Sequence, residues 1–326
     1  MITDTIYTHL NNVHQTKVLS LISKATEIKP DDTVSDVINK LSKNNSYDAF
    51  YFNGKSVLST NIRSLLTAKN IDQMKIEPYL YSLPHILPTD TVQRASNIIT
   101  HYRIREVQVV DKKQIIGVVT AKRIIKLLSE KDNRLIKANL IYTHSPITIS
   151  SNESLSTARR EMFNKRIDHL PVIHHNNVNQ VLTSFHVLAS IVPNERLGKK
   201  SIGGKMIHNL ESPIGNIGST RIPQCSTNDD LNKILDQMLR SDTSCCLVNL
   251  WDKLHGIITY RDILSLFATR LESEIPLYLV GMPEDQKNVD IITSKFQNTL
   301  KRLSKTYHEI QEAKIVIRQH RMSGKK

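Results

Sequence analysis

Hydrophobic positions along the chain alternate between helical spacing and short β-type runs, and this alternation returns four times. Each unit opens on Asp, Asn, Ser or Thr and continues with apolar residues every three or four positions. After Leu231, for example, apolar residues follow three, four and seven positions later, which places them on one face of a helix. The pattern predicts that the first helix of each unit begins at Val34, Val92, Leu155 and Leu231.

The second half of each unit is rich in β-formers and ends in an apolar pair, a hydroxyl residue and a further helix. The hydroxyl residues are Ser59, Thr120, Thr183 and Thr259. They lie 25 positions after the helix start in the first unit and 28 positions after it in the other three. A constant internal spacing is typical of one supersecondary unit that is repeated. We therefore expect four strand–helix–strand–strand–helix repeats, packed in pairs because one repeat cannot cover its own sheet.

Residues 256–262, with the sequence GIITYRD, resemble the signature of the CBS domain: Gly, two apolar residues, Ser or Thr, two further residues and Asp. The resemblance covers roughly residues 20–268 and is strongest in the second to fourth repeats. It implies an α/β (α+β) fold with four CBS repeats in two Bateman modules, residues 1–135 and 136–272. A small β-α-β segment, residues 273–326, would follow. The resemblance also implies AMP, ADP or ATP as a regulatory ligand, with no cofactor required, and a possible homodimer formed through the CBS modules.

In the CBS family the hydroxyl contacts phosphate and the Asp holds ribose hydroxyls, which suits a carboxylate that can accept two hydrogen bonds. Only the fourth repeat keeps both groups, Thr259 and Asp262, because Ile62, Arg123 and His186 stand at the Asp position of the first three repeats. The nucleotide-binding residues expected from the resemblance are Thr259, Tyr260, Arg261, Asp262, Thr183, His186 and Thr120. An alternative is that Thr259 and Asp262 simply cap the closing helix.

Composition narrows the class of protein further. The chain of 326 residues has a net charge of +13, and no apolar run is long enough to span a membrane. Its start lacks the layout of a secretory signal, and its three cysteines form no C-x-x-C pair, so we expect a cytoplasmic protein without membrane association. No G-x-G-x-x-G, P-loop, H-E-x-x-H or G-x-S-x-G motif occurs, so we expect no enzyme activity and no catalytic residue. Histidines near His174 read as a solvated turn, so no metal site is expected.

The C-terminal segment has its own pattern. Residues 275–281 and 313–318 read as strands, and the apolar residues between Val289 and Ile310 lie on one face of a long helix. Residues 275–326 hold ten Lys or Arg and five Asp or Glu, and a basic face opposite an apolar seam is typical of phosphate contact. The predicted RNA-binding residues are Lys295, Lys301, Arg302, Lys305, Arg318 and Arg321. The alternative is an ordinary solvated helix face.

Over about 50 residues this segment, with LKRLSKTY at 300–307 and EAKIVI at 312–317, resembles the first half of the ribosome hibernation-promoting factor fold. In that family the domain lies on the small ribosomal subunit and blocks the path of mRNA and tRNA. The two resemblances together imply a non-enzymatic, adenine-nucleotide-responsive regulator that binds the ribosome or rRNA and silences translation. The alternative is a CBS regulatory subunit of a metabolic enzyme or transporter, whose C-terminal segment docks on protein. A DNA-binding regulator is a third option, but the sequence has no helix-turn-helix pattern.

Overall fold

The computed structural model describes residues 2–53, 57–112, 114–175, 177–192, 209–267, 277–280, 292, 295–296, 299 and 313–316. The chain forms two compact units, Met1–Ala268 and Thr269–Lys326. The first unit holds the four repeats, and the second holds the C-terminal segment. None of the helices among these described residues is long and apolar enough to cross a membrane.

The first helix of each repeat begins at the residue that the sequence predicts. These helices are α2 (Val34–Lys43), α4 (Val92–Tyr102), α6 (Leu155–Lys165) and α8 (Leu231–Arg240). In each case the residue before the helix accepts a hydrogen bond from a backbone N–H in the first turn. The capping residues are Thr33, Thr91, Ser154 and Asp230. Capping satisfies one of the unpaired N–H groups of a helix start, which is why these boundaries are readable in the sequence.

An antiparallel hairpin follows the first helix of every repeat. The hairpins are β1 (Asp48–Phe52) with β2 (Val57–Asn61), β4 (Glu106–Asp111) with β5 (Gln114–Thr120), β8 (His169–His174) with β9 (Asn177–Thr183), and β11 (Cys245–Leu250) with β12 (Lys253–Thr259). Short strands add to these hairpins: β3 (Tyr81–Ser82), β6 (Thr143–His144), β7 (Ile149–Ser150) and β10 (Gln224–Ser226). The predicted order of elements is thus confirmed, although in the first two repeats the leading strand is reduced to a single parallel bridge.

A second helix closes each repeat. The closing helices are α3 (Ile62–Leu65), α5 (Ala121–Ser129), α7 (Ser184–Ile191) and α9 (Tyr260–Leu264), and the last continues as a 3-10 turn over Ser265–Phe267. The closing helix of the fourth repeat is therefore α-helical only as far as Leu264. Helix α1 (Ile2–His14) precedes the repeats and lay outside the predictions; its Leu10 is fully buried.

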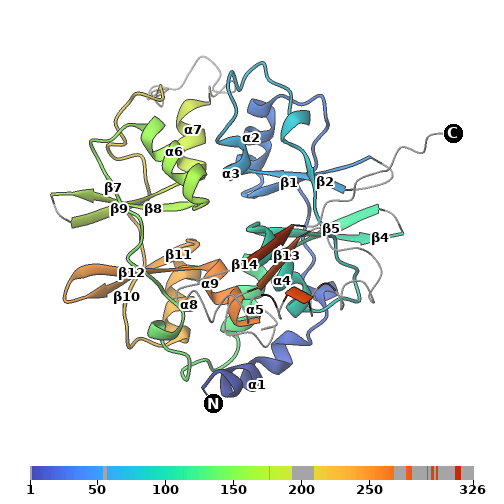
Figure 1. Cartoon of the computed structure of the whole chain (residues 1–326), viewed down its shortest axis with the longest axis vertical. Coiled ribbons are helices and arrows are strands. Elements are labelled where there is room, and N and C mark those ends of the chain that lie inside the picture. Colours follow the sequence, from blue (N-terminus) through green and yellow to red (C-terminus); the bar gives the residue numbers. More distant parts are fainter. Residues whose placement is uncertain are drawn as a thin grey trace. The chain divides into compact units, whose positions relative to one another are not determined.

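The repeats are joined in two different ways. Sheet faces pack the first repeat on the second, around Phe50 and Val118, and the third on the fourth, around Val181 and Leu247. Helices form two larger cores, one shared by the second and fourth repeats with α1, the other by the first and third repeats. In Figure 1 the first two repeats form one half of this unit and the last two form the other half. Each repeat therefore contacts two others through different faces.

Adjacent cysteines illustrate how a hairpin separates these two environments. Cys245 belongs to the sheet-to-sheet core and Cys246 to the helical core. The two side chains therefore point to opposite faces of β11, since side chains alternate along a strand.

In the C-terminal unit, β13 (Leu277–Val280) and β14 (Ala313–Val316) pair in parallel. Parallel neighbours require a crossover connection, as in the predicted β-α-β arrangement. Between the strands, Ile292, Lys295, Phe296 and Thr299 are helical. The first and third of these are half-buried, whereas Lys295 is exposed, as predicted for opposite faces. The other predicted RNA-binding residues lie outside the described residues: Lys301, Arg302, Lys305, Arg318 and Arg321.

Candidate functional site

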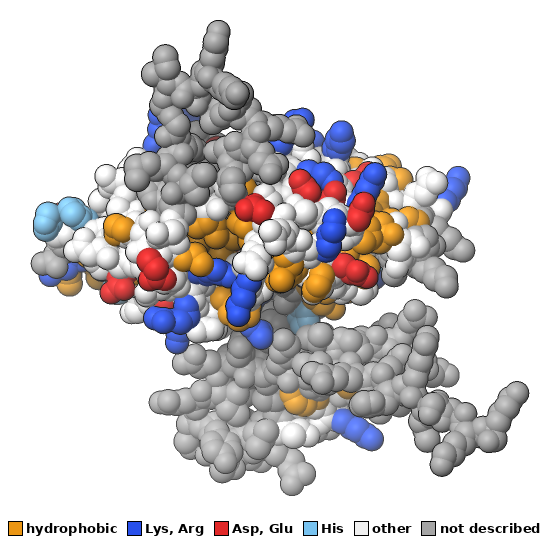
Figure 2. Space-filling view, turned by 90° about the horizontal axis from the view of Figure 1, so that it is seen from above, with side chains coloured by type: hydrophobic (Ala, Val, Ile, Leu, Met, Phe, Trp, Pro, Cys, Tyr) orange, Lys and Arg blue, Asp and Glu red, His pale blue; other side chains and the backbone are white. Residues whose placement is uncertain are grey.

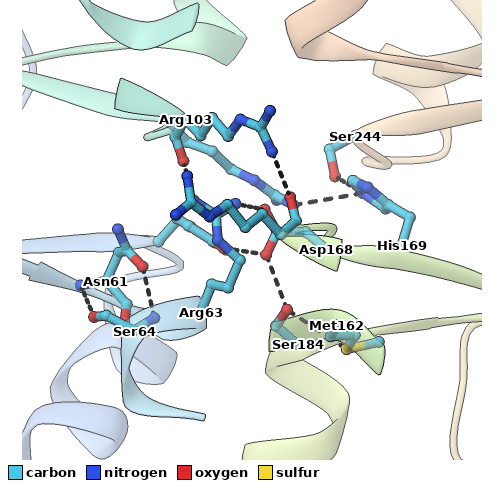
Figure 3. Close-up of polar contacts among 12 residues, drawn as sticks. Asn61, Arg63, Ser64, Arg103, Met162, Asp168, His169, Ser184 and Ser244 are labelled. Carbon is cyan, nitrogen blue, oxygen red and sulfur yellow. Dashed lines mark hydrogen bonds and ion pairs between the residues drawn. The ribbon is translucent and has the colours of Figure 1, made fainter. Parts of the chain in front are cut away.

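Polar residues from the starts of all four hairpins, together with Arg63 of α3, meet inside the first unit. We call this the central polar cluster; it consists of Tyr47, Asp48, Arg63, Arg105, Glu106, Asp168, His169 and Ser244. Asp168 accepts hydrogen bonds from the Tyr47 hydroxyl, from Arg63 Nη1 at 2.9 Å and from Ser184 Oγ at 2.9 Å. Figure 3 shows Arg63 and Ser184 approaching this carboxylate. Burial raises the pKa of Asp168, but the guanidinium groups of Arg63 and Arg105 and the Tyr47 hydroxyl outweigh it and leave the pKa below its ordinary value.

The same cluster continues into the fourth repeat through Arg105 and His169. The Arg105 guanidinium lies 4.3 Å from the centre of the Tyr47 ring, and its Nη2 lies 3.4 Å from His169 Nε2. The same imidazole nitrogen lies 2.8 Å from Ser244 Oγ. Burial, and then the nearby Arg105 charge, lowers the pKa of His169 to about 3, so the ring is neutral at physiological pH. Every repeat therefore contributes to one hydrogen-bonded network.

Asp48 and Glu106 form a buried pair of carboxyl groups in this cluster. Asp48 Oδ2 accepts from the backbone N–H groups of Arg105 at 2.8 Å and Glu106 at 2.9 Å. Glu106 Oε1 accepts from the backbone N–H of Tyr47 at 2.9 Å. Burial raises the pKa of both groups, that of Glu106 to about 7. The sequence predictions missed this pair, although polar residues stand at the start of two otherwise apolar hairpins.

A cleft of about 190 Å³ opens beside this cluster, and we call it the fourth-repeat cleft. Its walls come from the segment before the third repeat (143–147), the start of β8 (166–169) and the end of β12 with α9 (257–264). Of the predicted nucleotide-binding residues, Thr259, Tyr260, Arg261 and Asp262 all line it. Five arginines line it as well: Arg63, Arg103, Arg105, Arg166 and Arg261.

The Asp262 carboxylate has two environments. Its Oδ2 accepts from the backbone N–H of Thr259 at 2.7 Å and from the Thr259 hydroxyl at 2.6 Å. These hydrogen bonds cap α9, which is the alternative role given above for Thr259 and Asp262. Its Oδ1, however, accepts from the hydroxyl of Thr143 at 3.2 Å, a residue that also lines the cleft. One oxygen is thus structural, and the other faces a cleft wall.

Gly256 positions that wall. A Cβ at this residue would lie 2.1 Å from the Tyr142 ring and 3.0 Å from the carbonyl oxygen of Thr143. Only Gly lets β6 lie this close to β12, where Ile257 pairs with Thr143. The glycine of the signature is therefore what brings the Thr143 hydroxyl to Asp262.

The other predicted nucleotide-binding residues line a different space. Thr120, Thr183 and His186 belong to a cavity of about 810 Å³, which we call the central cavity. The Thr120 hydroxyl accepts from the backbone N–H of Arg123 at 3.1 Å. The backbone N–H of Thr183 donates to His186 Nδ1 at 3.1 Å, so the imidazole caps α7 as Asp262 caps α9. The structure therefore divides the predicted residues between two sites, although Tyr260 lines both.

In the first repeat the equivalent hydroxyl is covered. Ser59 is fully buried and its Oγ donates to the carbonyl oxygen of Tyr81 at 3.2 Å. Asn61 donates from Nδ2 to the Tyr81 hydroxyl. Strand β3 thus occupies the place where a ligand would meet this hydroxyl. Among the described residues, no group of three or more His, Cys, Asp or Glu side chains could hold a metal ion.

The family model of the CBS domain matches residues 80–130, 138–192 and 214–269. The chain contains CBS domains. The matched segments correspond to the second, third and fourth repeats, and the first repeat, which also has two helices and a hairpin, lies before them.

Solved structures share this fold. Protein MJ1225 from Methanocaldococcus jannaschii matches with a TM-score of 0.65 and 16% identity, over 78% of this chain and 100% of that one. An uncharacterized conserved protein from Pyrococcus horikoshii matches with a TM-score of 0.52 and 15% identity, over the same shares. These likenesses show the fold.

A curated relative is an uncharacterized 33.4 kDa protein in the ribosomal RNA operon of Thermofilum pendens. It is 22% identical over 198 residues, which are 60% of this chain and 65% of the relative. The chain therefore spans slightly less than two thirds of the length of this relative.

Proposed function

We propose that this protein is a non-catalytic regulator that binds an adenine nucleotide in the fourth-repeat cleft. The observation that supports the proposal is that Thr259, Arg261 and Asp262 line one cleft together with four further arginines. Asp262 Oδ1 is an acceptor for ribose, because a ribose hydroxyl can replace the exposed Thr143 hydroxyl that now donates to it. Guanidinium groups are suited to binding phosphate, because their planar N–H groups can donate two parallel hydrogen bonds to phosphate oxygens.

Apolar residues in the same cleft suit a base. Ile147 lines the cleft with 37% of its surface exposed, and the buried Ile257 lines it as well. Small-molecule sites usually combine such apolar walls with a few polar groups that fix the orientation of the ligand. MJ1225, which has the same fold, is named as a candidate archaeal homolog of γ-AMPK.

The response to the ligand would pass through Arg63. This side chain lines the cleft while it pairs with Asp168 and donates from Nη2 to the carbonyl oxygen of Arg103 at 2.8 Å. A phosphate in the cleft would compete with Asp168 for the guanidinium and so act on the contact between the first and third repeats. Calorimetric titration of the full chain with AMP, ADP and ATP tests the proposal. Absence of binding by all three would remove it.

For the C-terminal unit we propose RNA binding, with the ribosome as the partner, in a translation-silencing role. The exposure of Lys295 beside half-buried Ile292 and Phe296 supports a helix with one apolar and one basic face. The resemblance to hibernation-promoting factors rests on sequence pattern alone. The alternative is that this unit docks on an enzyme or transporter that the CBS repeats regulate. Salt dependence separates the two, because binding to nucleic acid weakens steeply as salt displaces phosphate contacts.

A further inference from the structure

Asp48 and Glu106 occupy equivalent positions in the first two repeats. Asp48 is the first residue of β1 and pairs with Asn61 at the end of β2, whereas Glu106 is the first residue of β4 and pairs with Thr120 at the end of β5. Each side chain reaches across to the other repeat, because Asp48 accepts from the backbone N–H of Glu106 and Glu106 accepts from that of Tyr47. The two acids are therefore joined reciprocally where the two sheets meet.

These two acids are withdrawn from water. Asp48 is fully buried, and 5% of Glu106 is exposed. On the face of the molecule in Figure 2, by contrast, the Asp and Glu side chains of the described residues lie among Lys and Arg at the surface, where solvent screens them. Among the described residues, Asp48 Oδ1 and Glu106 Oε2 have no hydrogen-bond partner. A carboxylate can only accept hydrogen bonds, so two ionised acids would leave both of these oxygens unsatisfied.

A proton on the pair would remove this deficit. A protonated carboxyl group is a donor, so one acid can then donate to the other. Two carboxyl groups that share a site do not both ionise readily, because the first charge repels the second. Burial is the largest cause of the raised pKa of Asp48, and the charge of Glu106 is the next. Burial also raises the pKa of Glu106, to about 7. Hydrogen bonding and electrostatics thus both favour one retained proton near neutral pH.

The charges of the central polar cluster also balance with one proton. The cluster holds three carboxyl groups and two guanidinium groups, those of Asp48, Glu106, Asp168, Arg63 and Arg105. Its imidazole, that of His169, is neutral because burial lowers its pKa to about 3. With one proton on the acid pair, two carboxylates face two guanidinium groups. Without that proton, the buried cluster carries one uncompensated negative charge, which costs free energy.

Other ionisable groups also face the pair. The Arg63 guanidinium and the Tyr81 hydroxyl interact electrostatically with Asp48. Burial raises the pKa of Tyr81, so this hydroxyl keeps its proton. Glu106 borders the central cavity, whose other charged lining residues are Lys24, Arg105, Lys122, Arg123, Lys126, Arg221 and Asp242. Among the described residues, no ion pair joins Asp48 or Glu106 to any of these cations.

Arg105 connects the acid pair to the fourth-repeat cleft. Its backbone N–H donates to Asp48 Oδ2 at 2.8 Å, and its guanidinium lies 4.3 Å from the centre of the Tyr47 ring. The same residue lines the fourth-repeat cleft. Its positive charge opposes the rise in the pKa of both acids, so Arg105 interacts favourably with their ionised forms. A second negative charge on the pair would therefore attract this guanidinium in competition with an anion in the cleft.

We propose that Asp48 and Glu106 share one proton at neutral pH, and that loss of this proton to the solvent draws Arg105 away from the fourth-repeat cleft. The pair thus favours an anion in the cleft when the pH is low and opposes it when the pH is high. The shared proton stands on the buried acids alone, whereas its effect on a nucleotide rests on the proposed function.

Infrared spectroscopy of the full chain tests the shared proton, because the C=O stretch of a protonated carboxyl group is separate from the bands of a carboxylate. One pH unit below and one above 7, ordinary Asp and Glu side chains are ionised. The wild type should show the band at the lower pH and lose intensity at the higher pH. Glu106→Gln and, separately, Asp48→Asn should remove this change, whereas Glu153→Gln, which alters an exposed acid, should keep it. A wild type without the band at the lower pH would overturn the proposal.

Nuclear magnetic resonance of ring-labelled tyrosine follows Arg105 without any ligand, because its guanidinium lies over the Tyr47 ring. Tyr47→Phe assigns the resonance. Its chemical shift should change together with the infrared band in the wild type and in Glu153→Gln, and should stay constant in Glu106→Gln. A Tyr47 resonance that ignores the loss of the proton in the wild type would show that Arg105 does not respond, against the proposal.

Calorimetry with AMP at the same two pH values measures the consequence for the cleft. From the lower to the higher pH, the affinity of the wild type should fall relative to that of Glu106→Gln, by at most about tenfold per pH unit for one linked proton. The phosphate of AMP titrates alike with both proteins, so the comparison cancels its contribution. Equal pH dependence in the two proteins would overturn the link between the acid pair and the cleft. If AMP binds neither protein, the proposed nucleotide site fails, and the infrared and Tyr47 measurements still decide the shared proton and the movement of Arg105.

Discussion

Arg63 in the first repeat and Asp168 in the third repeat form an ion pair of 2.9 Å in which 14% and 13% of the two side chains are exposed. The pair joins the first repeat to the third, and both residues line the fourth-repeat cleft. Because both charges are largely withdrawn from water, each needs the other as its counter-charge to offset the free energy of desolvation.

Replacing Arg63 by Ala should therefore destabilise the first unit by about 3 kcal/mol, because Asp168 keeps a buried charge without its main cation. Urea unfolding followed by circular dichroism measures the change. Arg94→Ala is the control, since its pair with Asp90 is more exposed and should contribute less than about 1 kcal/mol. Equal unfolding midpoints for the two variants would show that the Arg63 pair is not a stabilising contact.

Replacing Asp262 by Ala should lower the affinity for AMP, ADP or ATP by tenfold or more, because a hydrogen bond to a charged group contributes about 1.5–3 kcal/mol. Asp262 also caps α9, so Asp230→Ala provides a matched control that removes the N-cap of α8 outside the cleft. Both variants should lose about 1 kcal/mol of stability. If calorimetry finds the same loss of affinity in both, the effect comes from capping and not from contact with ribose.

Glu106 should make the stability of the first unit depend on pH. Its pKa is raised by burial from the ordinary value of 4.5 to about 7. Between pH 4.5 and about 7, Glu106 is ionised in the unfolded chain but holds its proton in the folded chain. The contribution of this group to stability is therefore greatest below pH 4.5 and declines as the pH rises to about 7. Urea titrations of the wild type between pH 4.5 and 8 measure this decline.

Glu106→Gln keeps an oxygen acceptor for the Tyr47 N–H and should flatten the pH dependence, leaving the contribution of Asp48. Exposed Glu153→Gln is the control and should retain the slope of the wild type. An unchanged slope in Glu106→Gln would exclude Glu106 as the titrating group.

Reversing Lys301, Arg302 and Lys305 to Glu should abolish co-sedimentation with ribosomes and leave folding nearly unchanged, because the sequence predicts that these charges lie on a solvated helix face, where they contribute little to stability. Sedimentation of lysates through sucrose at low and high salt gives the readout. A chain that ends at Ala268 should also fail to sediment, since it keeps the unit that holds the four repeats and loses the basic one. Continued sedimentation of the triple variant at physiological salt would show that this helix is not the contact surface.

Local features of the fold could be predicted from the sequence, and distant contacts could not. Thr91 and Asp230 mark helix starts because a cap acts within four residues, and the apolar spacing after them defines one helix face. Thr259 and Asp262 were found through a contiguous signature, and both line a cleft. The contact between Tyr47 and Asp168 joins residues that are 121 positions apart, and no local pattern encodes it.

The division of the site into two spaces also depends on tertiary structure. Thr120 and Thr259 occupy equivalent positions in the sequence repeats but line different cavities. The difference arises from the segments that lie against each hairpin, such as β3, which covers Ser59 in the first repeat. Helix α1 was missed although its buried residues Ile6, Leu10 and Val13 follow the spacing of one helix face.

The alternation of sheet contacts and helix contacts closes the four repeats into a ring. Linear repeat arrays have two end units with one neighbour each, so they can gain or lose a unit and still fold. Here every repeat has one partner across its sheet and another across its helices. Removal of any one repeat would expose two apolar surfaces at once, so the number four is fixed by geometry.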